Sequence, residues 1–204
     1  MHIAVIGAGI AGLVAACSLQ RAGHEVVVYE QRENPNADGA GLTLFGNAFA
    51  ALDAVGLGDE IRAIADNTLP QMRTGQRTPD GTWLTTIPPQ TVGQLYTVHR
   101  VTLHNTLLDL LAPGTIQTGT QALVSSDGSG RVQLPDGVET FDLVLAADGL
   151  RSRNRQRMGL DAGLQYSGYT AWRGVTAKGS LDLEGVAAET WGSGSIFGIV
   201  PLPE

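Results

Sequence analysis

The amino-acid sequence predicts an α/β fold whose first unit is a strand, a glycine-rich turn, a helix and a second strand. A short β-branched run leads directly into Gly7, Gly9 and Gly12, and a run of small, helix-forming residues follows. A second hydrophobic run ends in Glu30, eighteen residues after Gly12. Because all these features fall within about thirty residues, they indicate a Rossmann-like unit that binds a dinucleotide.

Each glycine of this G-x-G-x-x-G turn has its own mechanical reason. Gly7 permits the tight turn out of the strand, Gly9 lets the backbone approach a phosphate, and Gly12 lets the helix pack closely on the sheet. The helix N-terminus, with Ile10 and Ala11 in its first turn, then offers free amides to a pyrophosphate. Glu30 is placed to accept hydrogen bonds from ribose hydroxyls. The alternative interpretation is a tight turn that binds nothing.

Residues 3–19 contain no charged side chain and could also be read as a signal peptide or a membrane span. A signal peptide needs a basic region in front of it, and only Met1 and His2 precede this run. Seventeen residues with three glycines would make a short, poor spanning helix. The glycine spacing favours the nucleotide-binding fold, and we expect no membrane span.

The composition is that of an ordered globular protein. The 204 residues are 43% hydrophobic and 16% charged, enough for one large domain or for one domain and part of another. A net charge of −7 argues against binding to nucleic acid or to anionic membranes. The only cysteine, Cys17, excludes an internal disulfide and suits a reducing, cytoplasmic location. Its place on the first apolar helix indicates a small buried side chain.

The middle of the chain has the periodicity of short strands and helices. We expect a short strand in residues 39–44, helices over 47–55 and 59–65, a loose hairpin over 70–94, and an amphipathic helix after residues 96–100. The last of these helices places four leucines on one side, namely Leu103, Leu107, Leu110 and Leu111.

From residue 121 onward the pattern changes to that of strands. Short strands separated by Gly-rich turns over residues 121–147 predict a β-meander beside the parallel sheet, and the apolar run 142–147 predicts a buried parallel strand. A short helix over 151–157 and strands over 167–177, 186–191 and 196–200 are expected to follow.

Asp148 and Gly149 follow the predicted strand 142–147 at its carboxyl end. Alone, an Asp-Gly pair at a strand end is most often a turn. Ligands of open α/β sheets bind at this edge, however, so together with the glycine fingerprint the pair indicates part of the binding site.

Taken in order, these motifs resemble the FAD-dependent monooxygenases of the p-hydroxybenzoate hydroxylase type, especially the salicylate- and urate-hydroxylase-like branch. The resemblance covers essentially the whole chain. It rests on the glycine fingerprint and Glu30 and on four further segments, which are Gly39–Leu42, Val98–Arg100, Ala147–Ser152 and Tyr169–Gly174.

The resemblance implies FAD as the cofactor and NAD(P)H as a co-substrate, with oxygen transferred to an electron-rich small molecule. The protein must then exclude water from the reaction. The implied FAD contacts are the pyrophosphate at Gly7–Gly12 (Gly7, Gly9, Ile10, Ala11, Gly12), the ribose at Glu30, the adenine side at Gln31 and Ala122, the flavin near Thr43, the phosphate and ribitol region at Arg100, and the binding architecture at Asp148 and Gly149. Arg32 matches a cationic position of the family, with a solvated loop arginine as the alternative. No catalytic residue and no metal ligand is assigned.

The implied organisation is a Rossmann-like FAD-binding domain with a β-meander over residues 1–163 and the start of a mixed-sheet substrate domain over 164–204. Residues 66–96 are a candidate part of the substrate region. Ile196, Phe197 and Val200 are candidates for an apolar substrate wall, with ordinary core packing as the alternative.

The family carries a second Gly-Asp motif, which this sequence lacks after Leu150. We therefore expect a truncated or split product that self-associates or needs a complementing chain. Two further functions stay open, which are a different FAD- or NAD-dependent oxidoreductase on the same fold and a non-catalytic nucleotide-binding fragment or subunit.

Overall fold

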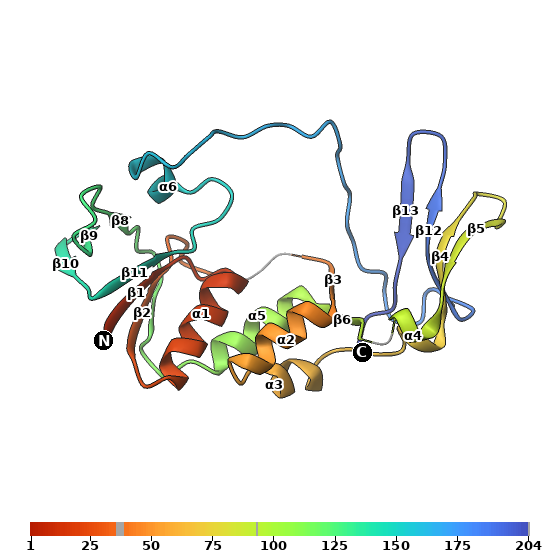
Figure 1. Ribbon diagram of the computed structural model, residues 1–204, viewed down its shortest axis with the longest axis horizontal. Coiled ribbons are helices and arrows are strands. Elements are labelled where there is room, and N and C mark those ends of the chain that lie inside the picture. Colours follow the sequence, from red (N-terminus) through yellow and green to blue (C-terminus); the bar gives the residue numbers. More distant parts are fainter. Residues whose placement is uncertain (36–38, 93, 204) are drawn as a thin grey trace. The chain divides into compact units, whose positions relative to one another are not determined.

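The computed structural model describes residues 1–35, 39–92 and 94–203. Its contacts divide the chain into two compact units. The first consists of Met1–Asp38 and His104–Trp172, and the second of Gly39–Leu103 and Arg173–Glu204. Both are α/β, as the sequence predicts (Figure 1).

A four-stranded parallel sheet forms the centre of the first unit. Its strand order is β11-β1-β2-β7, and every neighbouring pair is parallel. Helix α1 connects β1 to β2, as a βαβ unit requires. The bounds are β1 His2–Ile6, α1 Ile10–Arg21, β2 Glu25–Tyr29, β7 Ile116–Gln117 and β11 Leu143–Ala146.

Strand β11 differs from its prediction in burial. It pairs in parallel with β1, as expected, but it is the edge of the sheet and Leu143 is 39% exposed. The expectation of a fully buried strand is therefore wrong. An apolar run predicts that a strand joins a parallel sheet, but the number of strands beyond it decides how much of it is buried.

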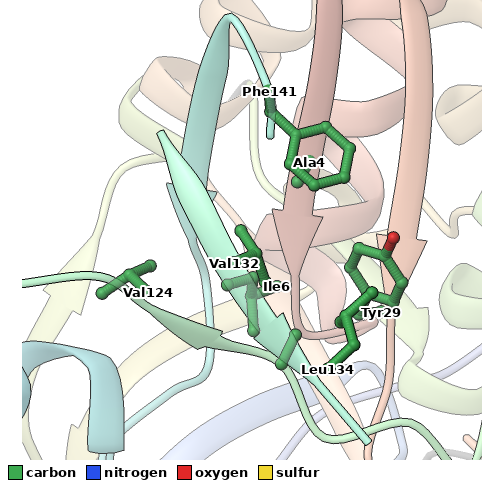
Figure 2. Packing of buried hydrophobic residues seen from close by; sticks show 8 residues of the cluster. Ala4, Ile6, Tyr29, Val124, Val132, Leu134 and Phe141 are labelled. Carbon is green, nitrogen blue, oxygen red and sulfur yellow. The ribbon is translucent and has the colours of Figure 1, made fainter. Parts of the chain in front are cut away.

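The β-meander is present as a three-stranded antiparallel sheet, β10-β9-β8. It covers one face of the parallel sheet and closes a hydrophobic core. Figure 2 shows Ala4, Ile6 and Tyr29 of the parallel sheet beside Val132 and Leu134 of β9. Each large apolar side chain buried here stabilises the fold by roughly 1.5–3 kcal/mol. The strands are β8 Leu123–Val124, β9 Arg131–Leu134 and β10 Gly137–Thr140.

Two further helices follow along the chain. Helix α5 (Arg100–Asp109) begins in the second unit and continues into the first, and it buries Leu103 and Leu107 as the leucine spacing predicts. Leu110 and Leu111, the other two leucines of the expected stripe, lie beyond its end. Leu107 also approaches Cys17, whose buried sulfur lies 3.3 Å from the Leu107 carbonyl oxygen. Helix α6 (Arg153–Arg157) begins after Ser152, whose side chain caps it by accepting a hydrogen bond from the amide of Arg155.

The second unit contains a mixed four-stranded sheet in the order β13-β12-β4-β5 and a separate antiparallel pair, β3 and β6. Strand β12 pairs in parallel with β4, while β4–β5 and β12–β13 are antiparallel. The bounds are β3 Gly41–Leu44, α2 Gly46–Ala54, α3 Gly58–Ala63, a 3-10 turn at Leu69–Gln71, β4 Arg73–Arg77, β5 Trp83–Ile87, α4 Pro89–Val92, β6 Tyr96–His99, β12 Val186–Trp191 and β13 Ile196–Ile199.

The expected strand over residues 167–177 is wrong. No strand lies between β11 and β12 in the part of the chain that the structure describes, and Tyr169 and Trp172 are 84% and 96% exposed. β-branched and aromatic residues favour a strand only where a neighbouring strand pairs with it. The division into residues 1–163 and 164–204 stays a prediction, although β4 of the 66–96 region shares a sheet with β12.

Candidate dinucleotide site

Three of the predicted site residues lie at the carboxyl edge of the parallel sheet. Gly7 follows β1, Glu30 follows β2 and Asp148 comes two residues after β11. The register aligns Ile6 of β1 with Tyr29 on one side and with Ala146 on the other. Because α1 leads to one neighbour of β1 and β11 returns on the other side, the edge is a topological switch point, where open α/β sheets bind ligands.

The chain's own packing requires glycine at two positions of the fingerprint. A Cβ on Gly12 would lie 1.9 Å from the Gly7 carbonyl oxygen. Gly7 itself has a φ of +106°, and a Cβ there would lie 2.6 Å from the Ala147 carbonyl oxygen. Both distances are far inside van der Waals contact. These two glycines therefore set the close approach of α1, β1 and the segment after β11.

Gly9 differs, because no described atom requires glycine at this position. It is the extended N-cap of α1, and a Cβ built on it meets no described atom within 4 Å outside its chain neighbours. The helical hydrogen bonds begin with the amide of Leu13, which donates to the Gly9 carbonyl oxygen at 2.9 Å. The amides of the first turn point out of the helix end, and this turn contains no acidic residue. A small, open N-terminus of this kind fits a pyrophosphate.

The residue between the first two glycines is held on both sides. The amide of Ala8 donates to Oε2 of Glu30 at 2.9 Å, and its carbonyl oxygen lies 2.8 Å from Nε2 of His104. Glu30 also accepts a hydrogen bond from the amide of Arg32 through Oε1, at 2.9 Å. Glu30 is half-buried beside the fingerprint. Each of its carboxylate oxygens can accept a further hydrogen bond, so the side chain can still accept from a ribose hydroxyl.

Gln31 and Arg32 are exposed just beyond β2. The backbone of this segment is fixed, because the carbonyl of Glu30 accepts from the amide of Thr120 at 2.9 Å and that of Arg32 accepts from Gly119 at 3.0 Å. The first unit thus holds Gln31 and Arg32 next to Glu30.

Asp148 is tied into the chain by its neighbours. Its Oδ1 accepts from the hydroxyl of Ser152 at 2.6 Å, and its Oδ2 accepts from the side-chain amide of Asn154 at 3.0 Å. The same side chain of Asn154 reaches β8, accepting from the amide of Val124 at 2.8 Å and donating to the carbonyl of Ala122 at 3.4 Å. Asp148 and Ala122, two predicted site residues, are therefore linked through one buried asparagine.

Three residues of this site are not among the predicted site residues, namely Asn154, Ser152 and His104. Ser152 had a detectable signal, because a serine directly before a short helix is a favoured N-cap. His104 lies between Leu103 and Leu107 on the buried side of α5, which is compatible with a structural histidine and does not indicate its contact with Ala8. Asn154 follows a run of charged and polar residues, so its burial had no local signal.

The remaining predicted residues belong to the second unit. Thr43 of β3 stands opposite Thr97 of β6 in the strand register. The amide of Arg100 donates to the carbonyl of Ala40 at 3.2 Å, and a Cβ on Gly39 would lie 2.7 Å from Cδ of Arg100. The arginine stem therefore lies along the glycine-rich segment before β3. Roles for Thr43 and Arg100 toward a flavin or phosphate stay predictions.

The three candidates for a substrate wall are all exposed. Ile196 is 62%, Phe197 64% and Val200 45% exposed, so none of them is packed in a core among the described residues. Their assignment to a substrate site stays a prediction.

A buried tyrosine connects the end of β2 to the meander. The Tyr29 hydroxyl donates to Glu139 of β10 at 2.8 Å, and the Tyr29 side chain is 1% exposed. Burial raises the pKa of Tyr29 well above its ordinary value of 10.0, and the hydrogen bond to the Glu139 carboxylate raises it further. The phenol next to Glu30 is therefore a neutral, structural group at physiological pH.

Within the described residues, no cluster of three or more His, Cys, Asp or Glu side chains could hold a metal ion. The same residues include no helix with the length and apolar character needed to cross a membrane.

Residues 1–192 match the family model described as FAD binding domain. The chain belongs to this family. One relative, 3-hydroxybenzoate 6-hydroxylase of Polaromonas naphthalenivorans, is 32% identical over 209 residues, which cover 94% of this chain and 50% of the relative. Among solved structures, 2-methyl-3-hydroxypyridine-5-carboxylic acid oxygenase matches with a TM-score of 0.66 and 27% identity over 78% of this chain and 42% of that one. Klebsiella pneumoniae HpxO in complex with FAD and uric acid gives a TM-score of 0.63 and 28% identity over 76% and 41% of the two chains.

These matches confirm the expected resemblance to aromatic hydroxylases and the Rossmann-like α/β fold, and they support FAD as the cofactor. The chain spans about half the length of the curated relatives that it matches.

Proposed function

We propose that this chain is the cofactor-binding part of an FAD-dependent monooxygenase. The observation that carries the proposal is the open N-terminus of α1 at Gly9, which lies beside Glu30 at the switch point of the parallel sheet. Gly7 and Gly12 have packing reasons inside the chain, whereas Gly9 has none. A bound ligand that occupies the space where a side chain would lie explains why position 9 is a glycine.

The residues at this edge fit the diphosphate and ribose of FAD. The first-turn amides at Ile10, Ala11 and Gly12 hold the pyrophosphate, helped by the positive end of the helix dipole. The Glu30 carboxylate accepts from the ribose hydroxyls. Gln31 and Arg32 stand on the adenine side together with the backbone at Ala122, and the turn at Asp148 and Gly149 fixes this edge.

Arg100 and Thr43 of the second unit are proposed as further cofactor contacts on the family resemblance. The permanent charge and forked donors of Arg100 suit phosphate oxygens, and the same resemblance assigns Thr43 to the flavin. When bound, FAD supplies the redox chemistry between NAD(P)H and oxygen, while the protein orients the cofactor and keeps water from it. The proposed reaction is the hydroxylation of an aromatic or similarly electron-rich small molecule.

The direct test is a titration of the purified chain with FAD and, separately, with FMN, followed by flavin absorption and fluorescence. FMN shares the isoalloxazine ring but lacks the adenosine and the second phosphate that this site is proposed to hold. The proposal predicts saturable one-to-one binding of FAD and binding of FMN that is about a hundredfold weaker. Equal affinity for both, or no binding of either, contradicts it.

Activity is tested on the chain together with added FAD by following NADH and NADPH oxidation with and without a panel of phenolic compounds. Stimulated oxidation with formation of a hydroxylated product supports the monooxygenase. Hydride transfer without oxygen consumption favours the alternative oxidoreductase, and FAD binding without turnover favours a cofactor-binding subunit.

A further inference from the structure

Ala8 and His104 are both almost completely buried, each with 2% of its surface exposed. The Ala8 carbonyl oxygen can only accept a hydrogen bond, so the proton of the 2.8 Å contact resides on Nε2 of His104. The other ring nitrogen, Nδ1, is buried and has no hydrogen-bond partner in the described part of the chain. Among the contacts that the structure describes, the bond to Ala8 is the only one that satisfies a ring nitrogen of His104.

The direction of this bond matters for the peptide unit that connects Ala8 to Gly9. None of the described peptide bonds is cis. In a trans peptide, the carbonyl of one residue and the amide of the next point in opposite directions within one plane. When His104 holds the Ala8 carbonyl, the Gly9 amide is therefore directed away from α5. Glu30 holds the preceding peptide in the same way, through the Ala8 amide.

We propose that His104 is a positioning residue for the dinucleotide loop. Its Nε2–H fixes the Ala8 carbonyl, and this orients the Gly9 amide toward the phosphate-binding side of the turn. The inference rests on the proposed binding of FAD and adds a residue from α5, about one hundred positions away in the sequence, to the site.

Two substitutions separate the hydrogen bond from the shape of the side chain. His104→Leu fills similar space without a donor, whereas His104→Gln keeps a side-chain N–H that can reach the Ala8 carbonyl. Leu107→Ala is the matched control, because Leu107 is fully buried on the same helix and its side chain has no polar group. The FAD affinity and the melting temperature are measured for the wild type and for these three variants.

We expect His104→Leu to weaken FAD binding about tenfold and His104→Gln to remain within about threefold of the wild type. Leu107→Ala should lower the melting temperature while FAD affinity of the folded protein stays within about twofold. If His104 were purely structural, His104→Leu would behave like Leu107→Ala, with a lower melting temperature and FAD affinity within about twofold of the wild type. That result overturns the inference. If the wild type itself binds no FAD, it is the proposed function that fails.

Nitrogen-15 NMR of the His104 imidazole and of the Gly9 amide provides a second test, which needs no ligand. The inference predicts that His104 carries its proton on Nε2, with Nδ1 as the bare nitrogen, and that the Gly9 amide resonance shifts in His104→Gln less than in His104→Leu. Protonation on Nδ1 in place of Nε2 overturns it.

Discussion

Asn154 donates a hydrogen bond from its side-chain amide to the carboxylate of Asp148 at 3.0 Å, and its backbone amide donates to the same oxygen at 3.2 Å. With 1% of its surface exposed, Asn154 also accepts from the amide of Val124. The carboxylate after β11 and the backbone of β8 are thereby held in one network. Buried networks of this kind are stabilising only while every member is satisfied.

The first prediction follows from this network. Asn154→Asp replaces the donor facing Asp148 with a second carboxylate, and we expect it to lower the free energy of unfolding by about 2–4 kcal/mol. Asn105→Asp is the control, because Asn105 is exposed on α5 and its substitution should change stability by less than about 0.5 kcal/mol. Urea denaturation measures both. Equal stability of the two variants would show that Asn154 does not hold Asp148.

The second prediction concerns alkaline pH. The pKa of Tyr29 is raised in the folded protein, so its stabilising effect is present below the unfolded value of about 10 and is lost as the pH rises above it. Above that pH the unfolded state releases a proton that the folded state retains. The stability advantage of the wild type over Tyr29→Phe should therefore shrink by up to about 1.4 kcal/mol per pH unit. Unfolding curves of both proteins from pH 8 to 11 measure it, and a constant difference contradicts the assignment.

How much of the fold could be predicted depends on how local its signals are. The turn at Gly7–Gly12, the acid at Glu30 and the leucines of α5 lie within single elements or adjacent ones, so periodicity and spacing were sufficient. The parallel pairing of β4 with β12 joins segments more than one hundred residues apart and had no local signal. The strand predicted around the exposed Trp172 was wrong for the complementary reason. The composition of this segment suits a strand, but no described strand pairs with it.

The site shows the same division. Gly7, Gly9, Gly12 and Glu30 form one short motif, and the structure brings them to one edge of the sheet. His104 and Asn154 act through contacts with backbone groups that lie far from them in sequence, Ala8 and Val124. A polar residue of this kind is identifiable only after the fold has shown that it is buried and which group it meets.

A third prediction tests the acid of the fingerprint. In the wild type, the two carboxylate oxygens of Glu30 accept from the amides of Ala8 and Arg32, one each. Glu30→Gln leaves only one side-chain oxygen to accept from these two amides. It also removes the charge that favours ribose hydroxyls, so FAD affinity should fall about tenfold. Glu25→Gln is the control, because Glu25 is exposed at the other end of β2 and should leave affinity unchanged. Calorimetric titration compares them, and parallel effects in both would count against a ribose contact.

We propose that the FAD pyrophosphate binds at the open position of Gly9. A comparison of FAD binding to the variants Gly9→Val and Gly174→Val tests this. Both glycines have open space at the Cβ position, and neither has a left-handed φ, so neither substitution should prevent folding. We expect Gly9→Val to weaken FAD binding about a hundredfold or more and Gly174→Val to bind FAD like the wild type. Wild-type affinity in a folded Gly9→Val protein would contradict it.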